Sequence, residues 1–405
     1  MTKHTNTPEL RFPEFSKEWE FQELGNLAQF SKGKLLSKKD LNISGIPCIL
    51  YGELYTRYGA ILNKVYSKTD SKKNSLVFSK KNQILIPSSG ETDIDIATAT
   101  AINTDLKIAI GGDLNIITPI NSDGRFISLY INGKGKHNLA KYAQGKSVVH
   151  LYNSDIKKLK FYLPSNNSEQ QKIGDFFSKL DQQIELEEKK LELLEQQKRG
   201  YMQKIFSQEL RFKDENGNAY PEWEVMKLKD ILSERKEYAS KIGNYPHATL
   251  STSGISLKSD RYNRDFLVKD KNKKYKVTIM NDICYNPANL KFGVITRNHI
   301  GSAIFSPIYI TFEVNNAHSP LFIELLVTRN DFINRVRKYE QGTVYERMAV
   351  KPEDFLNYET KIPCLEEQEK IGNFFSKLDK VINKQRQKID ELKLRKQGLL
   401  QKMFV

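Results

Sequence analysis

The sequence predicts an α+β protein in which two domains, related by a pseudo-two-fold axis, are joined by two long helices packed as an antiparallel coiled coil. Three observations predict this fold: an internal repeat, a seven-residue apolar period in the repeated segments, and short β-rich runs between them. Residues 169–181 read EQQKIGDFFSKLD, and residues 367–379 read EQEKIGNFFSKLD, in a chain of 405 residues. A repeat separated by about half the chain indicates duplicated domains, because solenoid repeats are only about 20–50 residues long.

The charge of the chain predicts a polyanionic partner. The formal net charge is +15 at pH 7, and the isoelectric point is near 9.3. Residues 169–206 carry seven Lys or Arg against eight Asp or Glu, and residues 367–404 carry ten against five, so most of the excess lies outside the repeated segments. Such a surface attracts nucleic acid. An ordinary solvated, lysine-rich surface is the alternative interpretation.

The composition also predicts a cytoplasmic protein. No window approaches 18 apolar residues, so no membrane span is expected, and the start MTKHTNTPEL lacks the apolar core of a signal peptide. Cys48, Cys284 and Cys364 are far apart and odd in number. This pattern predicts reduced thiols rather than disulfides or a zinc CxxC pair.

The sequence predicts one domain before the first repeated helix, at residues 1–165, and another after it, at residues 208–363. Both begin with Leu-Arg-Phe followed by Trp-Glu, and both end after Lys-Tyr-x-Gln-Gly. These shared openings and exits are residues 10–12, 210–212, 141–145 and 338–342.

Between these ends we expect short strands and one short helix per domain. Gly, Asn and Ser punctuate β-rich runs, which favours a twisted, mostly antiparallel sheet. The paired runs are 84–87 with 283–287 and 114–117 with 308–311, and the helices are expected near 126–142 and 320–339.

The repeated segments predict two spacer helices, at residues 166–207 and 364–405. Apolar residues recur at alternating spacings of three and four, the seam of a coiled coil. Polar residues interrupt both seams at the same places, Glu187/Gln385 and Lys198/Lys396, and such residues fix register. The predicted seam residues are Phe177, Leu180, Ile184, Leu191, Leu194, Phe375, Leu378, Ile382, Ile389 and Leu392.

Packing the two seams against each other buries both with no second chain. If a two-fold axis crosses the pair, the helices run antiparallel. Residues 173–206 would then form a rod of about 50 Å, at ~1.5 Å per residue. The alternative is a dimerisation coiled coil between separate chains.

This arrangement, with similar helices and dissimilar domains between them, resembles the specificity subunit of type I restriction–modification systems. The resemblance covers essentially the whole chain, and its most specific element is the doubled Glu-Gln-x-Lys-Ile, Phe-Phe, Leu-Asp run. In that family the dissimilar domains are target-recognition domains that each read one half of a split DNA sequence. The resemblance implies double-stranded DNA, type I methyltransferase subunits and type I restriction subunits as partners.

Polar loop tips flanked by predicted strands are the candidate DNA contacts, because Lys, Arg, Asn, Gln and hydroxyl groups reach phosphates and base edges. For any single loop an ordinary solvated turn remains the alternative. In the first domain the candidates are Lys32, Lys34, Ser88, Ser89, Lys146, Ser147 and His150. In the second domain they are Asn286, Asn289, Lys291, Arg297, Asn298, Thr343, Tyr345 and Arg347.

The sequence predicts no catalytic residues, no cofactor and no metal. Residues 286–289 read Asn-Pro-Ala-Asn, which lacks the second proline and the aromatic residue of a methyltransferase motif. Glu91, Asp93 and Asp95 could hold Mg²⁺, but no nearby lysine completes a nuclease site. Two other functions stay open: a stand-alone Mg²⁺-dependent nuclease fused to a recognition module, and a coiled-coil interaction scaffold.

Overall fold

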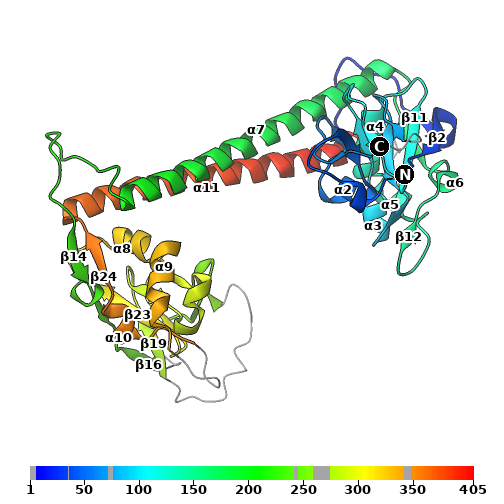
Figure 1. The fold of residues 1–405 in the computed structure, drawn as a ribbon. Coiled ribbons are helices and arrows are strands. Elements are labelled where there is room, and N and C mark those ends of the chain that lie inside the picture. The colour runs from blue at the N-terminus through cyan, green and yellow to red at the C-terminus, as the bar shows by residue number, and fades with distance from the viewer. Residues whose placement is uncertain (1–5, 35, 72–75, 241–244, 259–273, 342–347) are drawn as a thin grey trace. The chain divides into compact units, whose positions relative to one another are not determined.

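The computed structural model describes residues 6–34, 36–71, 76–240, 245–258, 274–341 and 348–405 (Figure 1). The chain divides into two compact units. Unit 1 comprises the residues up to Leu191 together with Gln385–Val405, and unit 2 comprises Glu192–Lys384. The two longest helices, α7 (Asn167–Phe206) and α11 (Leu365–Lys402), each contribute a part to both units.

The core of unit 1 is built on both faces of a five-stranded sheet. Ile84 and Ile86 of β7 belong to the main apolar cluster with helix α4, while Leu85 between them belongs to a second cluster on the opposite face. This burial explains why β7 reads as a continuous apolar run. The strands, in sheet order, are β2 (Ala28–Lys32), β11 (Leu114–Pro119), β7 (Ile84–Pro87), β9 (Thr100–Ile102) and β4 (Ile61–Leu62).

A four-stranded sheet and two ribbons complete the β-structure described in unit 1. Among its described strands, β10 with β3 and β4 with β9 pair parallel, and the other pairings are antiparallel. The smaller sheet contains β5 (Lys68–Thr69), β3 (Ile46–Ile49), β10 (Ala109–Ile110) and β6 (Val77–Phe78). The ribbons pair β1 (Glu20–Glu23) with β13 (Lys160–Leu163) and β8 (Ser89–Gly90) with β12 (Val149–His150). The short helices are α1 (Leu24–Leu27), η1 (Lys38–Asp40), α2 (Tyr51–Thr56), α3 (Asp93–Ile96) and α6 (Asn153–Ile156).

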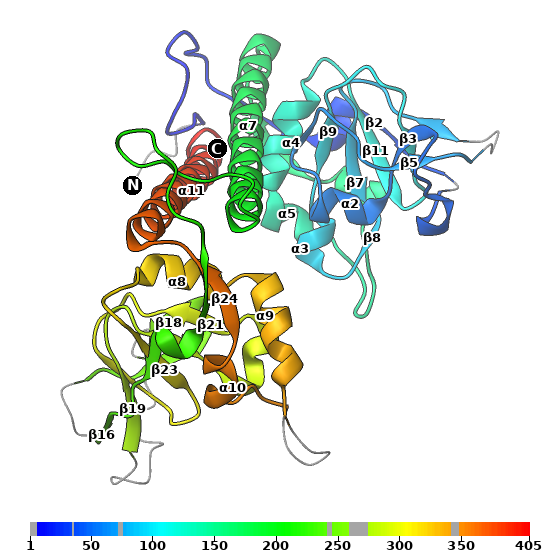
Figure 2. The same ribbon diagram turned by 60° about the vertical axis from the view of Figure 1, so that its left-hand side comes forward.

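The single helix expected near 126–142 is wrong, because two helices occupy this segment. They are α4 (Gly124–Asn132) and α5 (Lys136–Ala140), and α4 lies between the sheet and α7 (Figure 2). The chain turns at two glycines. A Cβ at Gly135 would lie 2.4 Å from the Tyr130 ring, so only glycine permits this close approach.

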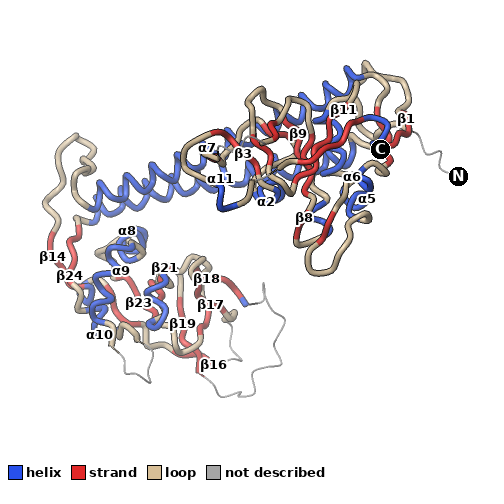
Figure 3. Tube along the Cα trace, turned by 45° about the vertical axis from the view of Figure 1, so that its right-hand side comes forward, coloured by secondary structure: helices blue, strands red, loops and turns tan. Residues whose placement is uncertain are grey.

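Unit 2 carries smaller sheets, and its helix α8 (Pro320–Val327) lies beside the start of α11 (Figure 3). Its four-stranded sheet contains β15 (Leu232–Glu234), β23 (Ile310–Val314), β20 (Ile283–Tyr285) and β21 (Ile295–Arg297). A three-stranded sheet contains β16 (Tyr238–Ser240), β19 (Lys274–Thr278) and β22 (Ala303–Phe305), in that order. Two two-stranded sheets pair β17 (Ala248–Ser251) with β18 (Gly254–Leu257) and β14 (Glu224–Lys227) with β24 (Glu359–Ile362). The helices are η2 (Leu228–Asp230), η5 (Pro287–Phe292), α8 (Pro320–Val327), α9 (Asn330–Val336), η6 (Arg337–Tyr339) and α10 (Pro352–Leu356).

In unit 1 the start of α7 is fixed by a buried carboxylate. Glu169 is 1 % exposed. It accepts hydrogen bonds from Arg11 Nε at 2.7 Å and from Trp19 Nε1 at 3.3 Å. A buried charge is costly unless it is paired and hydrogen-bonded. The Leu-Arg-Phe and Trp-Glu openings of the domain therefore supply the partners of this glutamate.

Unit 2 repeats the same contacts at the start of α11. Glu367 is fully buried and accepts from Arg211 Nη2 at 2.6 Å and from Trp223 Nε1 at 3.1 Å. This hydrogen bond raises the pKa of the Arg211 guanidinium above its usual value. In both units the buried glutamate of the repeat is thus paired with one arginine and one tryptophan from the opening of the domain.

The repeated glutamine next to each glutamate joins the long helix to a short one. Gln170 Oε1 accepts from the backbone N–H of Asp123 at 3.0 Å, just before α4 begins. Gln368 Oε1 accepts from the backbone N–H of Ser319 at 2.9 Å, just before α8 begins. The Glu-Gln pair therefore fixes the long helix against the short-helix segment of the same unit.

The Gln-Lys-x-Phe ending of each repeat places a phenylalanine against the aromatic residues of one unit, Phe404 in unit 1 and Phe206 in unit 2. We call each of these two phenylalanines the aromatic plug of its unit. In unit 1 Phe404 is fully buried, with ring centroids 5.1 Å from Phe126 and 6.3 Å from Trp19. In unit 2 Phe206 lies 5.5 Å from Phe322 and 6.0 Å from Trp223. The end of one long helix thus packs beside the start of the other within each unit.

Polar seam residues pair across the two long helices. In unit 1 Lys396 Nζ lies 2.5 Å from Asp181 Oδ1, and in unit 2 Lys198 Nζ lies 2.5 Å from Asp379 Oδ1. These are the same contact in the two copies, since both the lysines and the aspartates are repeat equivalents. Such part-exposed pairs add little stability, but they set the register of the seam.

The second polar interruption shows that the helices run antiparallel. In unit 1 Gln385 Nε2 donates to Glu187 Oε2 at 2.7 Å, while Asp181, earlier on α7, meets Lys396, later on α11. Hydrogen bonds from Gln385 and from Lys388 hold the pKa of Glu187 below its ordinary value. The predicted class, α+β with two long antiparallel helices, is confirmed.

The predicted seam residues are at least half buried. Phe177, Leu180, Ile184, Phe375, Ile382 and Ile389 are buried, and Leu191, Leu194, Leu378 and Leu392 are half-buried.

Candidate nucleic-acid interface

Two of the three candidate loops of unit 1 form one ribbon. Strand β12 pairs antiparallel with β8, so that His150 faces Ser89 and their Nδ1 and Oγ atoms lie 3.3 Å apart. The backbone N–H of Leu151 donates to the carbonyl of Ser88 at 3.2 Å. The loops at 88–90 and 146–150, distant in sequence, therefore form a single surface.

The third loop joins this surface through an aromatic residue. Lys32, at the end of β2, has its Nζ 5.7 Å from the centroid of the Tyr152 ring. That ring stacks on His150 at 6.1 Å. Asn153 Nδ2 also donates to the carbonyl of Ser31 at 3.0 Å. Lys32, Tyr152, His150 and Ser89 thus form a continuous row.

Two glycines allow these loops their shape. A Cβ on Gly33 would lie 2.0 Å from the carbonyl oxygen of Gly111, so the Lys32–Lys34 turn packs directly on backbone. Gly145 has φ +119°, a conformation that L side chains rarely adopt. Lys34, Lys146 and Ser147 are exposed beside these glycines, whereas Ser88 is buried.

In unit 2 the asparagines of the first candidate loop shape a helical turn. Asn286 is buried, and its Oδ1 accepts from the backbone N–H of Ala288 at 3.1 Å, capping η5, which starts with Pro287. The backbone N–H of Asn289 donates to the carbonyl of Asn286. An N-capping asparagine followed by proline is a common helix start. This local role accounts for the Asn286 side chain without a ligand, whereas Asn289 joins the turn through its backbone N–H.

Arg297 and Asn298 are also engaged within unit 2. Arg297 Nε donates to Glu324 Oε2 at 2.9 Å, and its Nη1 donates to Asn281 Oδ1 at 2.9 Å. Asn298 is fully buried and donates to Thr278 Oγ1 at 3.0 Å. Both side chains hold the β20–β21 region together in this conformation.

Lys291 is the exposed candidate in the described part of unit 2. Its Nζ lies 5.1 Å from the centroid of the Phe292 ring, and Phe292 is 64 % exposed. A lysine beside an exposed aromatic ring suits contact with nucleic acid. The candidates Thr343, Tyr345 and Arg347 lie outside the described residues.

The groups that suggested catalysis have structural roles in the described chain. Asp95 accepts from Thr92 Oγ1 at 2.7 Å, and Asp93 Oδ1 accepts from the N–H of Ile94, so these acids serve the first turn of α3. Burial raises the pKa of the Cys48 thiol to about 11, and it raises the pKa of the Cys284 thiol further. Both thiols therefore stay protonated and poorly nucleophilic at neutral pH.

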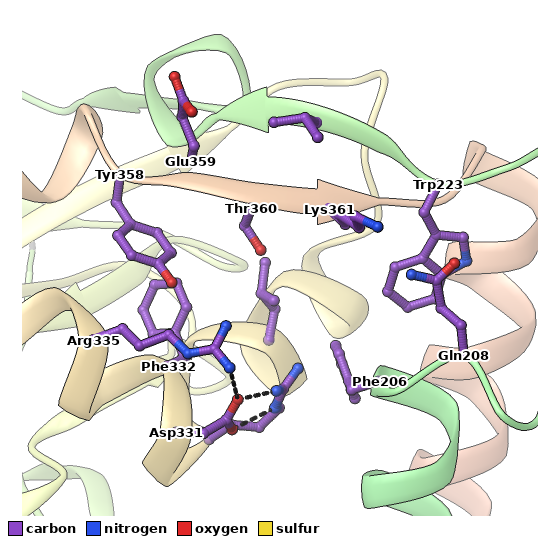
Figure 4. A pocket seen from close by; sticks show the side chains of 13 residues that line it. Phe206, Gln208, Trp223, Asp331, Phe332, Arg335, Tyr358, Glu359, Thr360 and Lys361 are labelled. Atoms are coloured by element: carbon purple, nitrogen blue, oxygen red, sulfur yellow. Dashed lines mark hydrogen bonds and ion pairs between the residues drawn. The ribbon is translucent and has the colours of Figure 1, made fainter.

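A pocket of about 400 Å³ lies in unit 2 beside the end of α7 (Figure 4). The Arg329 guanidinium lies 4.1 Å from the centroid of the Phe206 ring and pairs with Asp331. The same carboxylate lies 4.0 Å from Arg335. Residues of β24 line the facing wall. The charged groups Arg329 and Arg335 thus both pair with Asp331, and Arg329 covers the Phe206 ring. We therefore interpret this pocket as a structural feature around Phe206 rather than an active site.

Comparison with known proteins shows which family this chain resembles. Residues 16–196 match the family described as the type I restriction modification DNA specificity domain. Over these residues the chain is similar to the type I restriction–modification specificity family. The chain is 23 % identical over 308 residues to a putative type I specificity subunit of Mycoplasma genitalium, covering 72 % of this chain and 73 % of that one.

Two further comparisons point to the same family. A putative type I restriction enzyme specificity subunit of Methanocaldococcus jannaschii is 27 % identical over 212 residues, covering 47 % of this chain and 48 % of the relative. The crystal structure of the type I restriction–modification S subunit from M. genitalium has a TM-score of 0.61 at 17 % identity, over 98 % of this chain and 99 % of that one. The second comparison concerns the fold alone.

Sequence reasoning missed Tyr152 as a candidate. This ring is 43 % exposed and connects Lys32 to His150. The signal was present, since an aromatic residue stands two positions after a basic loop, a pattern of nucleic-acid binding surfaces. None of the helices in the described part of the chain combines the length and the apolar character that crossing a membrane requires.

Proposed function

We propose that this chain is a type I specificity subunit that reads a bipartite, asymmetric DNA site, with one half assigned to each recognition domain. The proposal divides the chain into recognition domains at residues 1–165 and 208–363 and spacer helices at 166–207 and 364–405. Double-stranded DNA is the ligand, and type I methyltransferase and restriction subunits are the protein partners. The chain itself is non-catalytic and positions the subunits that modify and cleave.

The observation that carries the proposal is that the two units share a frame but carry different loops. The buried Glu-Gln pairs and the aromatic plugs repeat contact for contact. Among the described residues the candidate surfaces differ: unit 1 presents the row from Lys32 to Ser89, whereas unit 2 presents Lys291 with Phe292. A shared frame with different surfaces suits two unlike half-sites on one duplex.

The long helices suit the role of a spacer. The helix α7 has 40 residues, a length of about 60 Å at ~1.5 Å per residue. Tethering two domains makes binding of the second half-site intramolecular, so that two weak contacts act as one strong one. A site with two defined halves then needs only modest affinity from each domain.

Exchanging residues 24–164 for the corresponding domain of another specificity protein is expected to change one half of the modified sequence and leave the other half unchanged. Each surface lies within its own unit, so the exchange leaves the second surface untouched. Mapping methylated bases in cells that carry the chain with its methyltransferase partner measures this. The reciprocal exchange of residues 223–363 is the matched control. Joint change of both halves in either exchange contradicts the proposal.

The chain without partners is expected to leave plasmid DNA intact in the presence of Mg²⁺. Within the described residues no group of His, Cys, Asp and Glu side chains could hold a metal ion. Gel electrophoresis of supercoiled plasmid measures nicking and cleavage directly. Mg²⁺-dependent cutting that disappears in Asp93→Asn and Asp95→Asn would instead support the nuclease alternative.

A further inference from the structure

Unit 1 carries a hairpin at its Gln-Gly exit, and the backbone pair at the base of this hairpin has an equivalent in unit 2. In unit 1 Gln144 pairs with His150 through two backbone hydrogen bonds, of 2.9 and 2.7 Å. In unit 2 Gln341 pairs with Ala349 through two backbone hydrogen bonds of 3.0 Å. The segments closed by these pairs differ. Residues 145–149 read GKSVV, and residues 342–348 read GTVYERM.

The glutamine side chains also make the same contact in the two units. Gln144 Nε2 donates to Asp155 Oδ2 at 3.0 Å, and Gln341 Nε2 donates to Asp354 Oδ2 at 3.1 Å. Asp155 is the third residue of α6, and Asp354 is the third residue of α10. This contact therefore ties the hairpin base to the short helix that follows it.

The aspartates are firm anchors because the short helices are fixed to the core. Ile156 and Phe355, the residues after the two aspartates, are fully buried in the main clusters of their units. Asp155 is itself buried and also accepts from Lys158 Nζ at 2.8 Å. The hydrogen bond from the Gln144 amide to Asp155 thus holds the base of the hairpin in a fixed position relative to the core.

The hairpin of unit 1 presents candidate DNA contacts on both sides of its base. Lys146 and Ser147 are exposed in the closed segment, and His150 beside Ser89 forms its returning strand. A loop that is held in its binding conformation loses less conformational entropy on binding. We therefore assign two roles within this hairpin. The Gln144–His150 pair at its base orients the loop, and the exposed residues Lys146 and Ser147 contact DNA.

We propose that Gln144 is a positioning residue for half-site recognition, holding the DNA-contacting hairpin of unit 1 through Asp155 of the following short helix. The inference rests on the proposed function and deepens it. It assigns a role to the Gln-Gly exit of unit 1, whose glutamine contacts repeat in unit 2 although the residues between the paired positions differ in sequence. It also predicts that loss of this contact, which we call the clamp, affects only the half of the DNA site that unit 1 reads.

The test measures binding of the full-length chain, with its methyltransferase partner, to the duplex that methylation mapping identifies. Gln144→Ala is expected to weaken binding about tenfold and to reduce discrimination against substitutions in the first half-site. Discrimination in the second half-site should stay as in the wild type. Gln341→Ala, which removes the equivalent contact in unit 2, is the matched control and should leave discrimination in the first half-site as in the wild type. Duplexes substituted in one half at a time provide the two readouts.

A donor–acceptor exchange separates positioning from general damage. Gln144→Glu alone sets two carboxylates against each other and should weaken first-half discrimination further. Combining it with Asp155→Asn lets the new amide donate to the new carboxylate, and discrimination should recover. Asp155→Asn alone controls for the lost Lys158 pair, and the thermal unfolding temperature of each variant controls for folding.

The outcomes are distinct. Unchanged half-site discrimination in Gln144→Ala overturns the clamp while the proposed function stands. Failure of the exchanged pair to recover, with unfolding unaltered, also overturns it. Absence of sequence-selective binding by the wild-type complex overturns the proposed function and the clamp with it.

Discussion

Glu367→Ala is expected to destabilise unit 2 by about 3 kcal/mol, because removal of one partner from a buried ion pair leaves the other charge without compensation. Glu367 is fully buried, and it is the shared acceptor for Arg211 and the indole of Trp223. The substitution therefore removes the buried carboxylate from the guanidinium, which among the described residues keeps only the exposed Glu222 at 3.6 Å as a charged partner, and it leaves the indole N–H without its acceptor. Glu367→Gln keeps the shape but loses the charge, and a loss of about 1–2 kcal/mol is expected.

The chain offers a built-in reporter for each unit. It contains two tryptophans, Trp19 in unit 1 and Trp223 in unit 2. In a Trp19→Phe background, the fluorescence of Trp223 follows the denaturant unfolding of unit 2 alone. The free energy of unfolding of Glu367→Ala is compared in this background with the same chain carrying Glu367.

A double-mutant cycle controls the interpretation. Arg211→Ala combined with Glu367→Ala should cost less than the sum of the single substitutions, because no unpaired guanidinium remains. Strict additivity would show that the two side chains do not interact energetically. Equal stability of Glu367→Ala and its parent would contradict the role assigned to the repeated glutamate.

The long helices were predictable because their signals are local and doubled. A sustained apolar period together with the repeated Glu-Gln run predicted where they begin and how they pack, and α7 and α11 run antiparallel as expected. The polar interruptions were visible in the sequence, but their partners were not. Asp181 and Asp379 receive the seam lysines from the other helix. Only the register of the packed pair shows this.

The candidate contacts in unit 2 were less predictable, because the same side chains serve turns and ligands. Asn286 caps a helical turn, and Arg297 is paired with Glu324 from α8. The sequence separates these partners, so their proximity is visible only in the fold. Conversely, the pairing of β8 with β12 fixes His150 beside Ser89, and Tyr152 lies next to His150 and to Lys32. This arrangement is also visible only in the fold. These DNA contacts stay predictions.

Phe404→Ala is expected to destabilise unit 1 by about 3–5 kcal/mol, the usual cost of truncating a fully buried phenylalanine. Besides Phe126 and Trp19, its ring lies 6.3 Å from Tyr130 and 6.4 Å from Phe177. Truncation opens a cavity among four aromatic rings and removes the plug that holds the end of α11. Denaturant unfolding followed by Trp19 fluorescence in a Trp223→Phe background measures the loss.

Phe206→Ala in unit 2 is the matched control and should cost less than Phe404→Ala. Phe206 is the repeat equivalent of Phe404, but it is only half-buried and lines an existing pocket of about 400 Å³ under the Arg329 guanidinium. The apolar surface lost to the cavity is therefore smaller. Equal or reversed costs would show that burial of the plug does not set the stability of the helix ends. A larger cost for Phe404→Ala would show that the helix end contributes more stability in unit 1, where the phenylalanine ring is fully buried and contacts four aromatic rings.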